Sequence, residues 1–313
     1  MDNIIFSANV VFPLLIIMFA GFITRRLNII DDNTSSQCNS LAFKVFLPIL
    51  LFNNARDCSL ETLANPKIFI YVTVAILSLF IIATFFVLVI EKDNKKRGVM
   101  IQGICRSNYA LFGIPLIILL MPNADMGLPS LLIAIVIPLF NLLSVTVLTY
   151  FSSEQKANFK DIFLAILKNP LIIATFIGLI FMFLQINIIE MLDNPLRQLG
   201  DIASPFALFM LGARFKFNEI KRVGKQLFIV CVSRLVLIPV IIIGIAIILG
   251  FRSVELACIL VIFASPTAVS SYTMAEKMGG DGDLASSIVI FTSTFSIISI
   301  FSFIYFLRIF ALI

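Results

Sequence analysis

Two apolar segments, each interrupted by a proline, lie at corresponding places in the two halves of the chain. Pro115 falls within SNYALFGIPLIILL and Pro266 within FASPTAVSSYTMAEK, about half the chain length apart. A proline inside a helix has no N–H to donate and clashes with the carbonyl four residues earlier. Each helix is therefore predicted to break there, leaving Leu111 and Ile262 without their usual partners. In hydrocarbon such a break survives only where it is buried in protein or lines a cavity, so both breaks are candidates for a binding site.

The composition places most of the chain inside a membrane. Of its 313 residues, 60% are hydrophobic and 13% are charged, and the mean hydropathy is +1.08. A helix needs about 20 apolar residues to cross a bilayer, and the loops between such runs are too short for a separate soluble domain. We therefore predict an all-α integral membrane fold with ten transmembrane helices, near Asn9–Ile23, Ser40–Phe52, Ile68–Ile90, Met100–Leu120, Leu131–Phe151, Leu171–Leu184, Ala203–Phe215, Phe228–Leu249, Ala257–Lys277 and Ala285–Leu307.

The basic residues are distributed unevenly between the loops. Most of the 23 lysines and arginines follow odd-numbered spans, so the positive-inside bias places those loops in the cytoplasm and both termini outside. The first span has Asp2 before it and Arg25 and Arg26 after it, which is the reverse of a signal peptide. The net charge of +5, sorted in this way, favours a multi-pass protein of the cytoplasmic membrane in contact with lipid. It gives no reason to expect a nucleic-acid partner.

The residue types that most catalytic and metal sites need are missing or scattered. The chain has no histidine, and its five cysteines lack the spacing of metal ligands. No aspartate or glutamate lies near the centre of a predicted span. We therefore expect no catalytic residues, no metal and no cofactor, and we do not expect an enzyme.

Further segments repeat at about half the chain length. FLPILLFNNAR, around Pro48, is similar to SPFALFMLGARF, around Pro205. Because each copy has five spans, the second must enter the membrane upside down relative to the first. We predict a first five-helix repeat at 1–152 and a second, inverted one at 171–313. Between them, KANFKDIFLAILK in the linker 153–170 has the spacing of an amphipathic helix on the cytoplasmic interface.

The spans near Ser40–Phe52 and Ala203–Phe215 each contain only about a dozen apolar residues and a proline, short for the hydrocarbon core. Two interpretations are open. Each is either a tilted or kinked packing helix, or part of the wall of a central cavity.

The motifs resemble those of one family. SNYALFGIPL, SPFALFMLGARF and ASPTAVSSYTMAEKMGGD followed by LASSIVIFTSTFS are similar to the auxin efflux carrier family, in its bacterial branch. The resemblance implies a fold of the bile-acid and sodium/proton antiporter type, in which spans 4 and 9 cross at their prolines. It also implies a transport domain of spans 3–5 and 8–10 that moves against a scaffold of spans 1, 2, 6 and 7. Bacterial relatives are associated with malate, malonate and similar organic acids, and the family suggests a homodimer.

The residues also point to an anionic ligand by their own chemistry. Two half-helices are expected to begin near the membrane midplane, and each N-terminus carries about half a positive charge. Asn108 lies two helical turns before Pro115, where its amide can donate to a carboxylate, and the family resemblance assigns it that contact; helix packing is the alternative. The candidate substrate-binding residues are Asn108, Arg106, Tyr109, Gly113, Ile114, Pro115, Ser265, Pro266, Thr267 and Lys44.

Three basic residues, Lys44, Arg106 and Arg234, lie inside predicted spans. Each either attracts the anion or extends its side chain to the cytoplasmic interface. We therefore expect a secondary active transporter of small organic anions, working by elevator-like alternating access. Two alternatives remain at this point. One is a sodium-coupled carrier of the bile-acid transporter type, with backbone carbonyls as ion ligands, and the other is a receptor that transports nothing.

Overall fold

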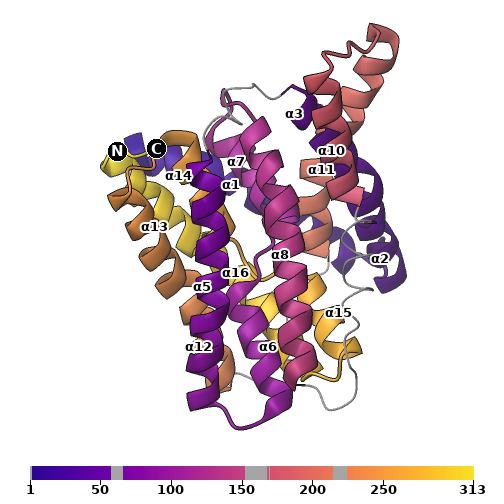
Figure 1. Ribbon diagram of the computed structural model, residues 1–313. Coiled ribbons are helices and arrows are strands. Elements are labelled where there is room, and N and C mark those ends of the chain that lie inside the picture. The colour runs from indigo at the N-terminus through magenta and orange to yellow at the C-terminus, as the bar shows by residue number, and fades with distance from the viewer. Residues whose placement is uncertain (1, 58–65, 152–167, 169, 214–223) are drawn as a thin grey trace.

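The computed structural model covers residues 1–313 and describes all of them except 1, 58–65, 152–167, 169 and 214–223 (Figure 1). Every secondary-structure element among the described residues is a helix. In the part of the chain that the structure describes, four helices are long and apolar enough to cross a membrane, at Lys67–Ile90, Gly127–Phe151, Lys225–Ile248 and Gly282–Ile309, and several shorter apolar helices accompany them. The prediction of an all-α integral membrane protein is confirmed.

The described helices overlap each predicted span, and two of the spans, Met100–Leu120 and Ala257–Lys277, are each divided into two half-helices. In chain order they are α1 (Asp2–Arg26), α2 (Asp32–Leu41), η1 (Ala42–Phe46), α3 (Leu47–Arg56), α5 (Lys67–Ile90), α6 (Asn94–Cys105), η2 (Tyr109–Gly113), α7 (Ile114–Leu120), α8 (Gly127–Phe151), α10 (Pro170–Phe183), α11 (Glu190–Ala213), α12 (Lys225–Val232), η4 (Ser233–Leu237), α13 (Ile238–Ile248), α14 (Ser253–Ala264), α15 (Ser270–Lys277) and α16 (Gly282–Ile309). The elements η1, η2 and η4 are single π-helical turns.

Each π turn stands just before a proline. Pro48, Pro115 and Pro239 are each the second residue of the helix that follows. A π turn bonds each N–H to the carbonyl five residues back, as Ile114 does to Tyr109, and it widens the helix locally. The helix continues through Pro115. The predicted break in this segment is real, but its predicted position at Pro115 is wrong, because the helix is interrupted at 106–108 instead.

The two spans predicted to be short belong to longer helices. The run Ser40–Phe52 lies within an unbroken helical segment from Asp32 to Arg56, and Ala203–Phe215 is represented by the last part of α11. The hydropathy pattern did not predict the first turns of α11, which begin at Glu190, because their residues are largely polar or charged. The described part of the predicted linker 153–170 is limited to residues 168 and 170, so the amphipathic helix lies outside the described residues.

Glycines let some helices pack backbone to backbone. A Cβ added to Gly21 of α1 would lie 1.9 Å from the carbonyl oxygen of Phe209 in α11, and one added to Gly212 of α11 would lie 1.8 Å from that of Met18. Gly178 of α10 likewise faces the carbonyl of Phe52 in α3 at 2.6 Å. Small residues commonly allow such close approach between helices in a membrane. In this way α1, α3, α10 and α11 form one tightly packed group.

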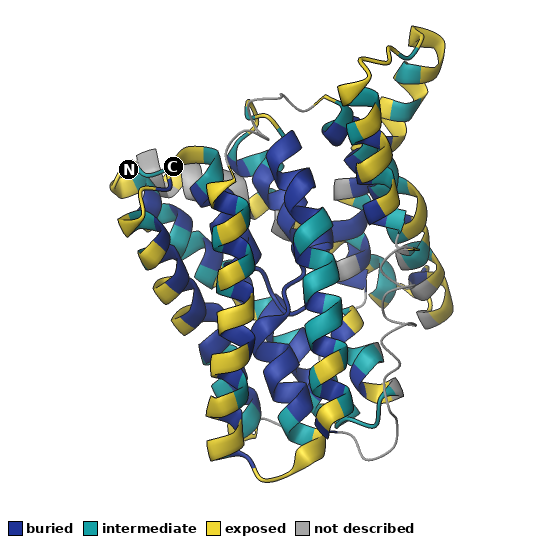
Figure 2. Ribbon diagram, viewed as in Figure 1, coloured by how far each residue is buried: buried dark blue, intermediate teal, exposed yellow. Residues whose placement is uncertain are grey.

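The helices from α5 to α8 and from α12 to α16 form a second group around α6 and α14, whereas α2 and η1 contact α11 of the first group. Residues Gly98–Cys105 of α6 and Leu256–Ala264 of α14 are buried throughout, whereas one face of α5 is exposed (Figure 2). Both chain termini and the turn between α10 and α11 lie at one end of the molecule, and the turn between α5 and α6 lies at the other (Figure 1). The core of the protein is therefore the region where α6, η2, α14 and α15 approach one another.

Candidate functional site

Two extended backbone segments cross at the centre of the buried region. One separates α6 from η2 and the other separates α14 from α15, and Ser107 pairs with Thr267 as an isolated antiparallel bridge. The N–H of Asn108 donates to the carbonyl of Pro266 at 2.8 Å, and the N–H of Ala268 donates to that of Arg106 at 3.4 Å. The two broken segments therefore cross, as the family resemblance implies, but only one of the two prolines lies at the crossing. Pro266 lies at the crossing and Pro115 lies two helical turns away from it.

Thr267 supports the crossing with both its backbone and its side chain. Its hydroxyl donates to the carbonyl of Gly103 at 2.8 Å, and its N–H donates to the hydroxyl of Thr292 in α16 at 3.1 Å. Thr267 is 1% exposed. These bonds satisfy backbone groups that the helix breaks would otherwise leave unpaired.

Several buried polar atoms at the crossing have no hydrogen-bond partner among the described residues. The amide nitrogen of Asn108 is one of them, and that residue is 4% exposed. The hydroxyl oxygens of Ser107, Ser265 and Ser271 are the others. A buried polar atom without a partner costs about 1–3 kcal/mol, and each one in a native protein calls for an explanation such as a bound ligand.

Arg106 is a buried cation beside the same crossing. Its guanidinium donates to the side-chain oxygen of Asn141 in α8 at 2.8 Å and to the hydroxyl of Ser270 at 3.0 Å, and it contacts the sulfur of Met274. No acidic side chain pairs with it among the described residues. Ser270 begins α15 and is exposed, so the charge of Arg106 lies at a half-helix N-terminus within reach of solvent. Asn141 was not among the predicted site residues, although a lone amide inside an apolar span is a recognisable signal.

The other predicted residues divide by position. The hydroxyl of Tyr109 donates to the carbonyl of Pro129 at 2.9 Å, and Ser265 and Pro266 are buried at the crossing. Further along, Gly113 lets η2 approach α14, because a Cβ there would lie 2.7 Å from a methyl carbon of Val261.

Beyond Gly113, Ile114 and Pro115 are buried in the packing of α7. Lys44 is exposed in η1, and no hydrogen bond or ion pair within the described residues joins it to the crossing. The structure therefore brings together the predicted residues on either side of Ser107 and Thr267, and it does not bring Lys44 to them.

Arg234 lies on η4 and is completely buried. Its Nε and one Nη donate to the carbonyl of Ser265 at 3.0 and 2.8 Å, and the latter Nη also donates to Ile262 at 3.2 Å. The other Nη donates to the carbonyls of Ile104 and Cys105 at 3.3 and 3.2 Å. Its side chain therefore points into the crossing and does not extend to the interface.

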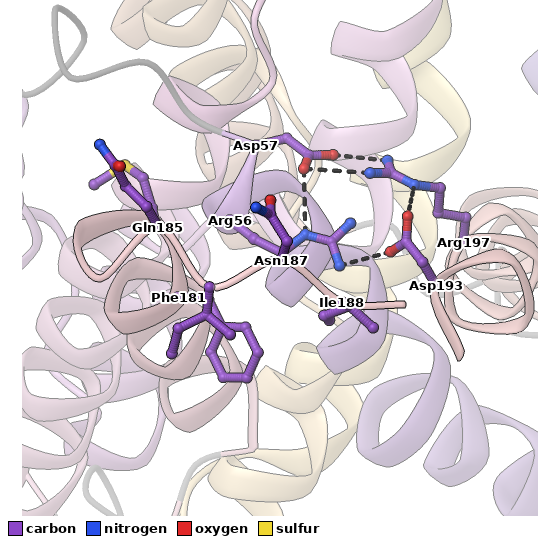
Figure 3. A pocket seen from close by; sticks show the side chains of 10 residues that line it. Arg56, Asp57, Phe181, Gln185, Asn187, Ile188, Asp193 and Arg197 are labelled. Atoms are coloured by element: carbon purple, nitrogen blue, oxygen red, sulfur yellow. Dashed lines mark hydrogen bonds and ion pairs between the residues drawn. The ribbon is translucent and has the colours of Figure 1, made fainter. Parts of the chain in front are cut away.

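A second polar site lies at the outer ends of α3 and α11 and lines a cavity of about 330 Å³ (Figure 3). Arg56 pairs with Asp193 at 2.6 Å, and Arg197 pairs with Asp57 at 2.7 Å and with Asp193 at 2.8 Å. Hydrogen bonds from Arg197 and from Arg56 hold the pKa of Asp193 below its ordinary value of 3.8. The charges are mutually satisfied, so this cluster fastens α3 to α11 and is a poor site for an additional anion.

Comparisons with known proteins identify the family of this chain. The family model described as "Membrane transport protein" matches residues 6–304. A protein of Rhizobium meliloti (strain 1021) described as "Putative malonate transporter" is 23% identical over 311 residues, which cover 96% of this chain and 95% of that protein. The chain therefore belongs to the membrane transport protein family, the auxin efflux carrier family that its motifs resemble, and it is a transporter and not an enzyme.

Proposed function

We propose that this protein is a secondary active transporter of small organic anions, with short dicarboxylates such as malonate or malate as the favoured class and monocarboxylates included. The observation that carries the proposal is the amide nitrogen of Asn108, which is buried without a partner at the crossing of the two broken helices. An amide N–H donor in that state is ready for an acceptor, and an ionised carboxylate is a strong one.

The charge around the crossing supports an anion. The half-helix of η2 and α7 begins at Tyr109, and α15 begins at Ser270, so two N-termini contribute about half a positive charge each. Arg106 adds a full positive charge that no acidic side chain balances among the described residues. Two positive helix ends close together suit a ligand with two neighbouring carboxylates, and the relative from Rhizobium meliloti is described as a "Putative malonate transporter".

The architecture that we propose for transport has ten spans in two inverted repeats, 1–152 and 171–313, joined by the linker 153–170. The antiparallel crossing of α6–α7 with α14–α15 supports it, because one broken helix from each repeat contributes. The separation into a group of α1, α3, α10 and α11 and a group around α6 and α14 supports an elevator-like shift of the second group against the first. A dimer of such subunits, with lipid around the exposed face of α5, is the assembly that the family suggests.

For localisation we propose the cytoplasmic membrane with both termini outside, on the basis of the basic loops. In a variant without native cysteines, a cysteine at Asn123 is expected to react with an impermeant thiol reagent in intact cells, and one at Lys95 is expected to be protected until the cells are opened. Both positions are exposed in the structure. The reverse labelling pattern would invert the orientation.

The transport proposal is tested with purified protein in liposomes. Labelled malonate is expected to accumulate inside and to be displaced by excess unlabelled malonate or malate. In detergent, malonate is expected to raise the melting temperature, since a ligand at about a hundred times its Kd stabilises the folded state by about 2.7 kcal/mol. Heat-inactivated protein and an organic cation of similar size are the controls. A protein that neither moves nor binds any mono- or dicarboxylate would contradict the proposal, and one that binds without flux would be a receptor.

A further inference from the structure

All five N–H groups of Arg234 are used on four backbone carbonyls of the crossing, of which that of Ser265 accepts two. A guanidinium has one N–H on Nε and two on each Nη. The structure uses one from Nε and two from each Nη, all directed at backbone oxygens of Ile104, Cys105, Ile262 and Ser265. These carbonyls close the C-terminal ends of α6 and α14, where a helix leaves its last oxygens unpaired.

The positive charge of Arg234 also balances the partial negative charges of the two helix ends that it contacts. The C-terminus of each half-helix carries about half a negative charge, so two of them facing one point amount to about one elementary charge. Arg234 supplies a single positive charge there, and no acidic side chain pairs with it among the described residues. It is 0% exposed, so neither its charge nor its donors are shared with water.

Carbonyls at the ends of broken helices are also the oxygens that coordinate Na⁺ in transporters that couple to it. Here those oxygens are already bonded to the chain's own cation. We propose that Arg234 is a positioning residue that takes the place of a coupling cation at the crossing, so that anion transport by this protein does not require Na⁺. This inference rests on the proposed function, and it disfavours the sodium-coupled alternative.

The first test uses the wild-type protein. Initial rates of malonate uptake are measured in liposomes with Na⁺, K⁺ or N-methylglucamine at equal ionic strength, so that screening is the same in each. The expected result is the same rate in all three. Uptake that is lost when Na⁺ is replaced would overturn the inference while leaving the proposed substrate class intact. Absence of uptake under every condition would count against the proposed function, and the next measurement would still test Arg234.

The second test replaces the guanidinium. Arg234→Met is expected to lower the melting temperature in N-methylglucamine, and Na⁺ is expected to restore part of the loss by binding the freed oxygens. Arg234→Lys keeps the charge but has fewer donors. Its melting temperature is expected to lie between those of Arg234→Met and the wild type and not to change with Na⁺. Arg252→Met is the matched control, because Arg252 also donates to backbone carbonyls, of Ile247 and Phe251, but at one helix end and in an exposed position.

Two outcomes would overturn the assignment. One is an Arg234→Met protein as stable as the wild type. The other is a destabilised Arg234→Met protein whose melting temperature responds to Na⁺ no more than that of Arg252→Met. If Arg234→Met does not insert, Arg234→Lys and the wild-type uptake series decide the question.

Discussion

Asn108→Ala is expected to weaken malonate binding about ten- to hundred-fold, because a hydrogen bond to a charged acceptor is worth about 1.5–3 kcal/mol. Asn108→Asp is expected to abolish binding altogether, since it places a carboxylate where the ligand's own carboxylate is to lie. The dissociation constant is measured by calorimetry with malonate, and the uptake rate is measured in liposomes. Asn187→Ala, on the exposed turn between α10 and α11, is the control and is expected to bind normally.

The melting temperature of Asn108→Ala without ligand distinguishes a ligand-binding role of Asn108 from a packing role. The amide nitrogen has no partner within the described residues, so removing it costs no hydrogen bond in the empty protein. The melting temperature without malonate is therefore expected to stay unchanged or to rise slightly, while the increase that malonate gives to the wild type disappears. A lower melting temperature with unchanged affinity would mean that Asn108 serves packing and not the ligand.

Gly212→Ala is expected to be the most destabilising single-methyl change in the tightly packed group of α1, α3, α10 and α11. The new Cβ would lie 1.8 Å from the carbonyl oxygen of Met18 and 2.5 Å from its carbon, and both atoms belong to backbone that no side-chain rotation can move. Helices α1 and α11 must separate to admit it. Overpacking costs about 1–3 kcal/mol where side chains can adjust, and more is expected where only backbone can yield.

Gly244→Ala is the matched control for this change. It adds the same methyl group to helix α13, and nothing lies within 4 Å of the new atom. Alanine favours a helix over glycine by up to about 1 kcal/mol, so this variant is expected to be as stable as the wild type or more stable. Melting temperatures of both variants are measured in the same detergent. Equal melting temperatures would show that α1 and α11 are not in the close contact described here.

The sequence indicates the class of fold because few backbone structures can satisfy their hydrogen bonds inside the hydrocarbon core of a membrane. Runs such as Ile68–Ile90 and Leu131–Phe151 have few alternatives to a buried or lipid-facing helix, and α5 and α8 coincide with them at their C-terminal ends. The break at Pro266 was likewise predicted correctly. Its carbonyl and the residues beside it are held by partners from the other half of the chain.

The position of the first break was not predictable by the same rule. Pro115 lacks a donor, yet the helix runs through it after a π turn, as it also does at Pro48 and Pro239. The segment 106–108 contains neither proline nor glycine, and it is extended because Pro266 and Ala268 offer it hydrogen bonds from far along the chain. A partner that is distant in sequence leaves no local pattern.

Arg234 illustrates the same limit for a single side chain. Sequence alone placed it inside a span with two interpretations, attraction of the anion or extension to the interface, and neither describes what the structure shows. Its four carbonyl partners become available only after two helices have been interrupted at one point. Asn141 and Ser270 became partners of Arg106 in the same way, through contacts between spans.

The short bridge between Ser107 and Thr267 ties the two broken segments together at the centre of the buried region. A tilt of α6 that α14 did not follow would break both backbone bonds of the bridge and draw one pair of carbonyls away from Arg234. Breaking such bonds without water to replace them costs several kcal/mol for each group exposed. The crossing is therefore expected to move as one rigid unit and not to bend, so that under the proposed elevator-like mechanism the binding site beside it keeps its shape throughout the movement.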